Sequence, residues 1–322
     1  MRMFTIMFRL YFFIISNMII KKMYNSPTVL LKGINAKFLR GLATVQASMM
    51  APFFDTTTSD SNKETYVLFN HFGAIKEWLD EVDFSFIEDF DYEIKNKDWQ
   101  NGFQVDRNTL EDSKKTLGND VEREINFSLN SWTNFPDKLI TALLENGEVG
   151  HAFDGLDFFE TSRPALQMVG TTISNLYTGT GITIALLTAD LAGATTAMRA
   201  YMAKNGDPFN YNPKWSVIIP PHLEWLFKAV RNSVDIVIAG VTQTNIFKDT
   251  FEIVVNDYLP ASNNHWYLVN TNAPMKPFIY QTRAVPKFDF KDDKDKKFIK
   301  YFSTARMNAG YGNPLAITKV HN

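Results

Sequence analysis

Histidine serves acid–base catalysis and metal binding near neutral pH, and this sequence contains five of them. They are His71, His151, His222, His265 and His321. A helical metal site needs two ligands three or four residues apart, and no two of these histidines have that spacing. The histidine pattern therefore predicts no metal site.

The best candidate for chemistry is His151, because Asp154 and Asp157 follow it closely. Carboxylates near a histidine could orient it as a general base or share a metal with it. The same residues also have turn chemistry, since an Asp side chain can hydrogen-bond to the backbone two residues further on. We favour a turn that lets the three phenylalanines between residues 153 and 159 pack. A hydrolase that uses His151 and Asp154 is the alternative.

Other sequence signals of enzymes are missing. The chain has no G-x-S-x-G, H-E-x-x-H or G-x-x-x-x-G-K-[ST] motif. Its glycine-rich run, Thr178-Gly179-Thr180-Gly181, lacks the third glycine and the strand-to-helix setting of a nucleotide site. The absence of cysteine excludes disulfides, thiolate metal sites and cysteine nucleophiles. We therefore predict a protein that is not an enzyme and needs no cofactor.

The overall charge argues against a protein that neutralises nucleic acid. Lys and Arg total 33, Asp and Glu total 35, and the formal net charge is -2. Binding to the phosphate backbone would require a surplus or a cluster of basic residues. The overall charge therefore does not predict a protein that compensates the charge of a nucleic acid.

The N-terminal residues 3–20 are strongly apolar and precede Lys21 and Lys22. Arg9 interrupts this run, and residues 10–20 alone are too few to cross a bilayer. No small-residue cleavage site follows closely, which argues against a secretory peptide. We favour translation from Met18 or Met23, with an ordered arm or a membrane anchor as alternatives.

Helix and strand signals are mixed without a regular alternation, which predicts an α+β fold. We interpret residues 1–65 as an N-terminal arm with one amphipathic helix near 30–39 and a polar loop at 56–65. Residues 66–106 are typical of hairpin strands, with a turn at Asn101-Gly102. The acidic, aromatic stretch 81–91 predicts either contacts with a neighbouring subunit or an ordinary solvated hairpin.

A long helix is expected from Asn119 or Asp120, which could cap it, to Gly147, which could end it in a left-handed conformation. Pro136 should kink this helix or restart it after Asn134. Apolar residues recur every three or four positions and define one buried face. They are Val121, Ile125, Leu129, Trp132, Phe135, Leu139 and Leu143.

The remaining sequence predicts two more helices and several strands. One helix is expected over residues 188–204, capped by Thr188, and the other buries Leu223, Leu226, Phe227 and Val230. The mixed-charge segment 287–300 has the composition of a solvated loop. Strands are expected at 215–219, 251–255, 265–270, 278–282 and 297–304.

Five blocks of sequence, in order along the chain, resemble the Mu-like prophage major head subunit family, the gpT-like capsid proteins. The first is YEIKNKDWQNGFQVDRNTLED at 92–112, which is similar to a family strand followed by the entry to a long helix. The other blocks lie within 135–161, 197–225, 266–281 and 308–312. Residues 1–22 have no counterpart in the family pattern, and the run 302–310 departs from it.

The resemblance implies the HK-97-type phage capsid fold and, with it, a division of the chain. Residues 1–65 would form the N-terminal arm, with 1–22 possibly not translated, and 66–106 the extended loop hairpin. Residues 107–185 would form the peripheral domain with a long spine helix, and 186–264 the axial domain. Residues 265–322 would return as the last peripheral strands.

The function implied is that of a major capsid protein of a Mu-like phage, prophage or gene-transfer particle. Copies would form hexamers and pentamers of an icosahedral shell around double-stranded DNA, bound non-specifically, in the bacterial host cytoplasm. Scaffold-protease and portal proteins would be further partners, and no membrane is expected. Phe84, Phe86 and Phe90 are the intersubunit contacts that we predict. The alternatives are an encapsulin-type compartment, the hydrolase mentioned above, and a membrane-anchored surface protein.

Overall fold

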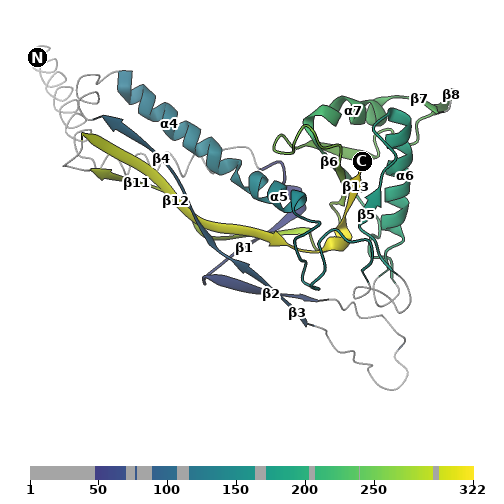
Figure 1. Cartoon of the computed structure of the whole chain (residues 1–322), viewed down its shortest axis with the longest axis horizontal. Coiled ribbons are helices and arrows are strands. Elements are labelled where there is room, and N and C mark those ends of the chain that lie inside the picture. The colour runs from purple at the N-terminus through teal and green to yellow at the C-terminus, as the bar shows by residue number, and fades with distance from the viewer. Residues whose placement is uncertain are drawn as a thin grey trace, which may run out of the picture. The chain divides into compact units, whose positions relative to one another are not determined.

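The computed structural model describes residues 48–69, 77, 89–106, 116–163, 172–202, 207–238, 240–292 and 297–322 (Figure 1). The predicted arm helix near 30–39, the apolar run at 3–20 and the proposed translation starts lie outside these residues. The chain divides into two compact units, which we describe one at a time. Helices and strands mix along the chain as the α+β prediction requires.

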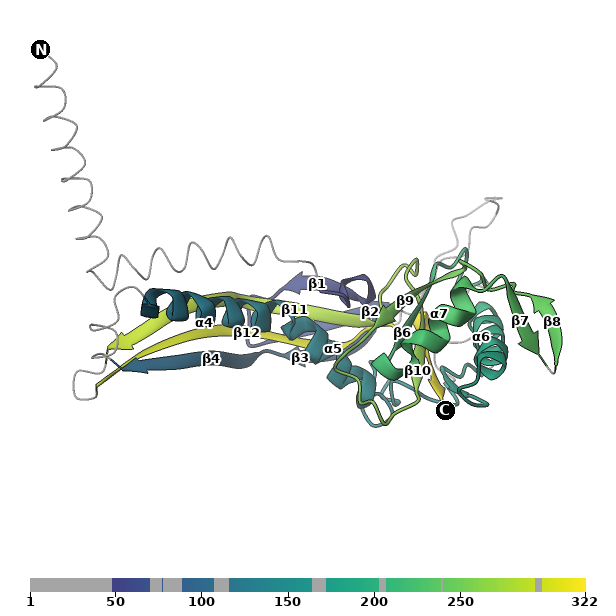
Figure 2. The ribbon, with the colours of Figure 1, turned by 90° about the horizontal axis from the view of Figure 1, so that it is seen from above.

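The first unit places one helix along a group of long strands (Figure 2). The helix is α4 (Thr116–Thr133), and the strands are β4 (Lys97–Asp106), the later part of β11 (Phe278–Asp292) and the earlier part of β12 (Phe298–Tyr311). The order in the full sheet is β1-β11-β12-β4. On α4, Ile125, Ser128 and Trp132 are buried, which confirms Ile125 and Trp132 as members of the predicted apolar face.

The predicted restart of the long helix is confirmed. Helix α4 ends at Thr133, and α5 (Phe135–Glu145) begins after Asn134, with Pro136 in its first turn, where a missing N–H costs least. The buried face of α5 differs from the prediction, since Ile140 and Leu144 are buried and Leu139 and Leu143 only half-buried.

Two predictions about the ends of the long helix are wrong. Helix α4 begins at Thr116, so Asn119 and Asp120 lie inside it rather than capping it. Gly147 is not in the left-handed region. It is needed for space instead, because a Cβ there would lie 2.6 Å from Phe159 Cε2.

Two predicted loops are strands. Asn101-Gly102 lies within the continuous strand β4, where glycine lets the backbone of β12 approach; a Cβ on Gly102 would lie 2.8 Å from Tyr301 O. The segment 287–300 belongs largely to β11 and β12. Phe288 is buried while Lys287 and Lys291 are exposed, so the charges that suggested a loop occupy one face of a strand.

The polar stretch 56–65 was also expected to be a loop, and this is wrong. It contains the end of β1 (Phe54–Thr58), a tight turn, and the start of β2 (Lys63–Phe69). Strand β1 pairs in parallel with β11, and β2 pairs antiparallel with β3 (Asp89–Lys95). The turn is stabilised by Glu64, whose Oε1 accepts from the backbone N–H groups of Asp60 at 2.9 Å and Ser61 at 3.0 Å.

The second unit contains a five-stranded mixed sheet of order β5-β13-β10-β6-β9. Helices α6 (Ile184–Arg199) and α7 (Glu224–Asn232) pack against this sheet, and the hairpin β7 (Asp235–Ile238)–β8 (Val241–Thr244) follows α7 (Figure 1). The sheet strands are β5 (Leu176–Thr178), β13 (Ile317–His321), β10 (Trp266–Asn270), β6 (Trp215–Ile219) and β9 (Phe251–Val255). Short 3-10 helices lie at Ala51–Phe53, Pro221–Leu223 and Pro314–Ala316.

The core of this unit lies between the sheet and α6 and α7. Trp266 and Leu268 of β10 belong to it, and Phe227 of α7 meets the Trp266 ring edge-on at 5.2 Å. On the other face of β10, Tyr267 packs near Phe159, with ring centroids 5.6 Å apart. Because both faces are covered, β6 and β10 are buried along their whole length.

The predicted strands β6 and β9 have the bounds expected from the sequence. Phe227 and Val230 of α7 are buried as predicted, Leu223 is buried just before the helix begins, and Leu226 is only half-buried. The predicted start of α6 at Thr188 is wrong, because the helix begins at Ile184. Its N-cap is Thr183, whose Oγ1 accepts from the Leu186 N–H at 3.4 Å. Thr188 lies one turn inside the helix and donates to Ile184 O instead.

Candidate assembly surfaces

The root of the β2–β3 hairpin is held by a buried glutamine, Gln281 of β11. Its Nε2 donates to Ile94 O at 3.0 Å and to Asn96 Oδ1 at 2.9 Å. Its Oε1 accepts from the Tyr66 hydroxyl at 2.8 Å. Burial raises the pKa of Tyr66, so this hydroxyl stays a neutral donor, and it lies 2.7 Å from Thr57 Oγ1. We call these five residues, Thr57, Tyr66, Ile94, Asn96 and Gln281, the hairpin root.

Strand β3 is also fastened to the end of β12. Asn308 Nδ2 donates to Lys95 O at 2.8 Å, and the Tyr311 N–H donates to the Tyr92 hydroxyl at 3.1 Å. Gly310 allows this approach, since a Cβ there would lie 2.5 Å from Ile94 Cδ1. These contacts could not be predicted from the sequence, because the partners lie more than 200 positions apart.

The predicted contact residues Phe84 and Phe86 lie outside the described residues. Phe90 lies in β3, opposite Leu68 of β2. Of the acidic residues nearby, Glu93 is exposed and forms an ion pair with Lys63 at 2.6 Å.

Helix α4 is anchored to its strands through Trp132. The Trp132 indole N–H donates to Ser303 Oγ at 2.7 Å. Ser303 Oγ also lies 3.3 Å from Ser128 Oγ, and both serines are buried. This polar contact inside an apolar interface fixes the position of α4 along β12 as well as its rotation.

Several large apolar side chains of the second unit are exposed. Trp225 on α7 is 74% exposed and stacks under Lys228 Nζ, 4.7 Å from the ring centroid. Tyr211 is 80% and Ile246 76% exposed. On the β7–β8 hairpin, Val237 and Val241 are exposed as well. Aromatic residues are enriched at protein interfaces, but the sequence pattern could not separate these from core residues.

The candidate catalytic group does not form a site. The Asp154 side chain is fully buried and pairs with Arg163 Nη1 at 2.5 Å, so its carboxylate is neutralised by a guanidinium. His151 is exposed and its Nδ1 lies 3.1 Å from Asp157 Oδ1. The Leu156 N–H donates to Asp154 Oδ1 at 3.3 Å, which confirms the predicted turn. Phe158 and Phe159 are buried beside it, and Phe153 is half-buried.

In the glycine-rich run 178–181, polar groups of Thr180 are hydrogen-bonded to another part of the protein. The Thr180 N–H and hydroxyl both donate to the Asp190 carboxylate, at 2.9 and 2.8 Å. A carboxylate in that position would repel a phosphate. A Cβ on Gly179 would collide with Asn322, so packing accounts for this glycine.

Three of the other histidines have polar or aromatic partners within the protein. His222 Nε2 lies 3.0 Å from Asn264 Oδ1. The His265 and His321 rings stack with centroids 3.9 Å apart, next to Lys319, which is buried and pairs with Glu148. Burial, followed by the charge of Lys319, lowers the pKa of His265 to about 4. Within the described part of the chain, no three His, Cys, Asp or Glu side chains are placed to hold a metal.

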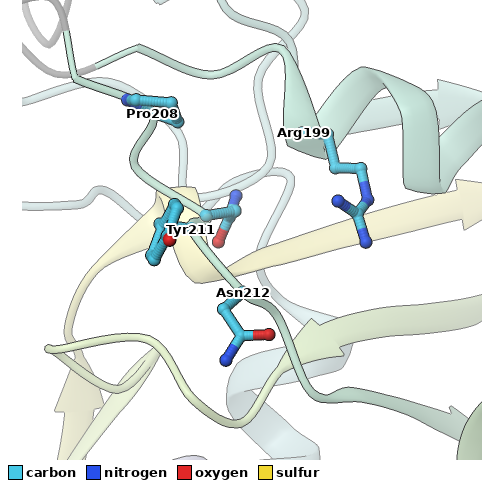
Figure 3. Close-up of a pocket in the computed structure, with 5 residues that line it drawn as sticks. Arg199, Pro208, Tyr211 and Asn212 are labelled. Atoms are coloured by element: carbon cyan, nitrogen blue, oxygen red, sulfur yellow. The ribbon is translucent and has the colours of Figure 1, made fainter.

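A shallow hollow of about 410 Å³ lies between the end of α6 and residues 208–212 (Figure 3). Figure 3 shows Arg199 extending from α6 and the Tyr211 ring on the facing loop, apart from it. Asn210 is fully engaged, donating to Met198 O at 2.8 Å and accepting from Asn270 Nδ2 at 2.8 Å. With one charged group and no convergent donors, this hollow has little capacity to select a ligand.

None of the helices in the described residues combines the length and apolarity needed to cross a membrane. The sequence pattern of the family described as Mu-like prophage major head subunit gpT matches residues 28–190 and 260–321. The Mu-like prophage FluMu major head subunit of Haemophilus influenzae is 23% identical over 288 residues, covering 87% of this chain and 68% of the relative.

Solved phage capsid structures share the fold. The procapsid of bacteriophage JBD30 matches with a TM-score of 0.52 and 20% identity, over 92% of this chain and 76% of that one. The SrpI encapsulin of Synechococcus elongatus PCC 7942 matches with a TM-score of 0.50 and 8% identity, over 87% and 88%.

Proposed function

The chain belongs to the Mu-like prophage major head subunit gpT family, and from this membership we propose how its surfaces build a phage head. It is a major capsid protein with the HK-97-type α+β fold. The observation that supports the rest of the proposal is the sequence match, which covers both ends of the described chain.

We propose that copies of the chain assemble into hexamers and pentamers that close into an icosahedral shell around double-stranded DNA. Closed shells follow from repeated contacts between identical surfaces under rotational symmetry. The exposed side chains of Trp225, Tyr211 and Ile246 supply apolar area that one subunit leaves in water. Each chain has a net charge of -2, so we expect the shell to enclose DNA non-specifically and with little compensation of the phosphate charge. Scaffold-protease and portal proteins would act during assembly in the bacterial host cytoplasm.

The division of the chain follows the same proposal. Residues 1–65 act as arm, 66–106 as extended loop, 107–185 and 265–322 as peripheral domain, and 186–264 as axial domain. The antiparallel pair β2–β3 supports the extended loop, since it is a two-stranded ribbon that leads into residues 70–88. Helix α4, with its buried face on β12, supports the spine helix.

We propose that Phe84, Phe86 and Phe90 dock onto a neighbouring subunit. The test replaces all three with serine and examines the expressed protein by negative-stain electron microscopy. Soluble subunits that fail to close into shells are expected, because the apolar contact is lost. The control replaces the same three with leucine, which keeps the apolar surface and should still assemble. Normal shells from the serine variant would contradict the proposal.

An encapsulin-type compartment is the second candidate, favoured by the likeness to the SrpI encapsulin in fold. That likeness, at 8% identity, concerns the fold alone. Purified particles that carry a protein cargo and no nucleic acid would favour it. Particles that package DNA when the phage partners are supplied would favour the head protein.

A further inference from the structure

We propose that Gln281 is the positioning residue of the extended loop: by joining both strands of the β2–β3 ribbon to β11, it sets the direction in which residues 70–88 meet the neighbouring subunit. This inference rests on the proposed function of that loop. The hairpin root itself consists of described residues within one compact unit.

A two-stranded ribbon needs such a residue. The ladder between β2 and β3 fixes the register of the two strands, from Lys63 opposite Lys95 to Phe69 opposite Asp89. It does not fix the angle between the ribbon and the sheet below it, and isolated two-stranded ribbons are only marginally stable and twist strongly. The angle must come from contacts at the base of the ribbon.

Gln281 is suited to set this angle because its amide group is used completely. Both N–H groups donate, to Ile94 O of β3 and to Asn96 Oδ1, and the oxygen accepts from Tyr66 of β2. The side chain is fully buried, so each of these groups would lack water if the glutamine were removed. A hydrogen-bond network that is complete and buried permits one geometry.

The network extends to the turn that precedes β2. Asn96 Nδ2 donates to Ser59 Oγ at 2.7 Å and to Ser61 O at 2.9 Å, and Ser59 Oγ donates to Glu64 at 2.8 Å. The Ser59 N–H donates to Thr282 O at 3.0 Å, next to Gln281. The amide of Gln281 therefore connects the turn, both hairpin strands and β11.

The test compares three variants of the full chain. Gln281→Met keeps the volume and removes all three hydrogen bonds, and Tyr66→Phe removes only the bond from β2. Tyr267→Phe is the matched control, because it removes a hydroxyl from a buried tyrosine in β10 that donates to Leu144 O at 3.3 Å, away from the root. Amide hydrogen exchange of unassembled subunits is measured in peptides covering 60–69, 89–97 and 266–270, and shells are counted and sized by electron microscopy.

We expect Gln281→Met to raise amide exchange in β2 and β3 at least tenfold with the 266–270 peptide unchanged, and to give few closed shells or shells of mixed size. Tyr66→Phe should have the same effects to a smaller degree. Tyr267→Phe should lower stability but form normal shells. If Gln281→Met does not fold, Tyr66→Phe decides, since Tyr66 is only half-buried.

Three results would overturn the inference, and the first two are unchanged exchange at the root and a loosened root with shells of normal number and size. Shell defects in Tyr267→Phe equal to those in Gln281→Met would also overturn it, since general destabilisation would then explain both. The exchange data separate this test from the proposed function. If the serine variant of the three phenylalanines assembles normally, the loop contact fails, whatever the root variants show in exchange.

Discussion

Trp132 provides the clearest test of how α4 is held on its strands. The side chain is 6% exposed and makes two separable contributions, the packing of its ring and the hydrogen bond from Nε1 to Ser303 Oγ at 2.7 Å. Trp132→Ala removes both, and truncation of a buried aromatic residue costs about 3–5 kcal/mol. Trp132→Phe keeps most of the ring packing and removes the N–H, for which about 1 kcal/mol is expected.

The hydrogen bond alone should be a minor loss because Ser303 keeps other partners. Its Oγ lies 3.3 Å from Ser128 Oγ and donates to Asn101 O at 3.3 Å. The unsatisfied group that Trp132→Phe leaves behind is therefore small. From these two figures, we expect the alanine variant to lose roughly three to five times as much unfolding free energy as the phenylalanine variant.

Guanidinium unfolding of unassembled subunits, followed by circular dichroism at 222 nm, measures both losses. Hydrogen exchange in a peptide covering 123–133 confirms that the loss lies in α4. A loss below about 1 kcal/mol for Trp132→Ala would refute the buried packing, since that is less than core truncation costs. Equal losses for the two variants would refute the division between ring and hydrogen bond.

Three further predictions concern the second unit. Asp154→Asn should cost about 3–5 kcal/mol in a denaturant titration, because it removes the carboxylate that neutralises the buried charge of Arg163; a loss below about 1 kcal/mol would contradict the buried pair. The pKa of His265 is lowered in the folded state, so its contribution to stability is complete above its ordinary pKa of 6.5 and is lost as the pH falls from there to about 4. His265→Asn should therefore weaken the pH dependence of the denaturant midpoint across that window. An unchanged pH dependence would refute the assignment. Thr183→Ala removes the N-cap of α6 and should lower stability by about 1 kcal/mol, whereas Thr183→Ser should be nearly neutral; equal losses would exclude capping.

Parts of the fold could be predicted because their signals are local. The strand at 215–219 has a continuous apolar run ended by Pro220-Pro221, and both its length and its burial followed from that. The break before α5 followed from Pro136, because proline has no backbone N–H to donate within a helix interior. In each case, neighbouring residues contain the whole physical reason.

The errors have a common cause, which is that composition does not reveal partners distant in sequence. Asn101-Gly102 has turn chemistry, but the backbone of β12 comes so close that glycine is required in a strand. The charges at 287–291 suggested a loop, yet they alternate with buried Phe288. Gln281 appeared as one polar residue in a predicted strand, and its importance depends on residues 57, 66, 94 and 96.

The same reasoning explains why the predicted site residues gave little chemistry and why the family carried the functional conclusion. Asp154 looked like a partner for His151, but its carboxylate pairs with the buried Arg163, nine positions away, and His151 lies beside Asp157 instead. The fold leaves the aromatic side chains of Trp225 and Tyr211 largely exposed, and exposed aromatic residues are enriched at protein interfaces.

The phage-head and compartment interpretations share one fold, so the choice between them depends on contents and not on the subunit core. A head protein must tolerate DNA packed under its inner surface, whereas a compartment must recognise a protein cargo. Gln281 bears on both interpretations, because in our proposal it sets the direction in which the loop leaves the subunit. We therefore expect Gln281→Met to disturb shell size before it disturbs contents: particles that form should vary in diameter yet retain the same class of cargo. Uniform particles with altered contents would show that the root does not control closure.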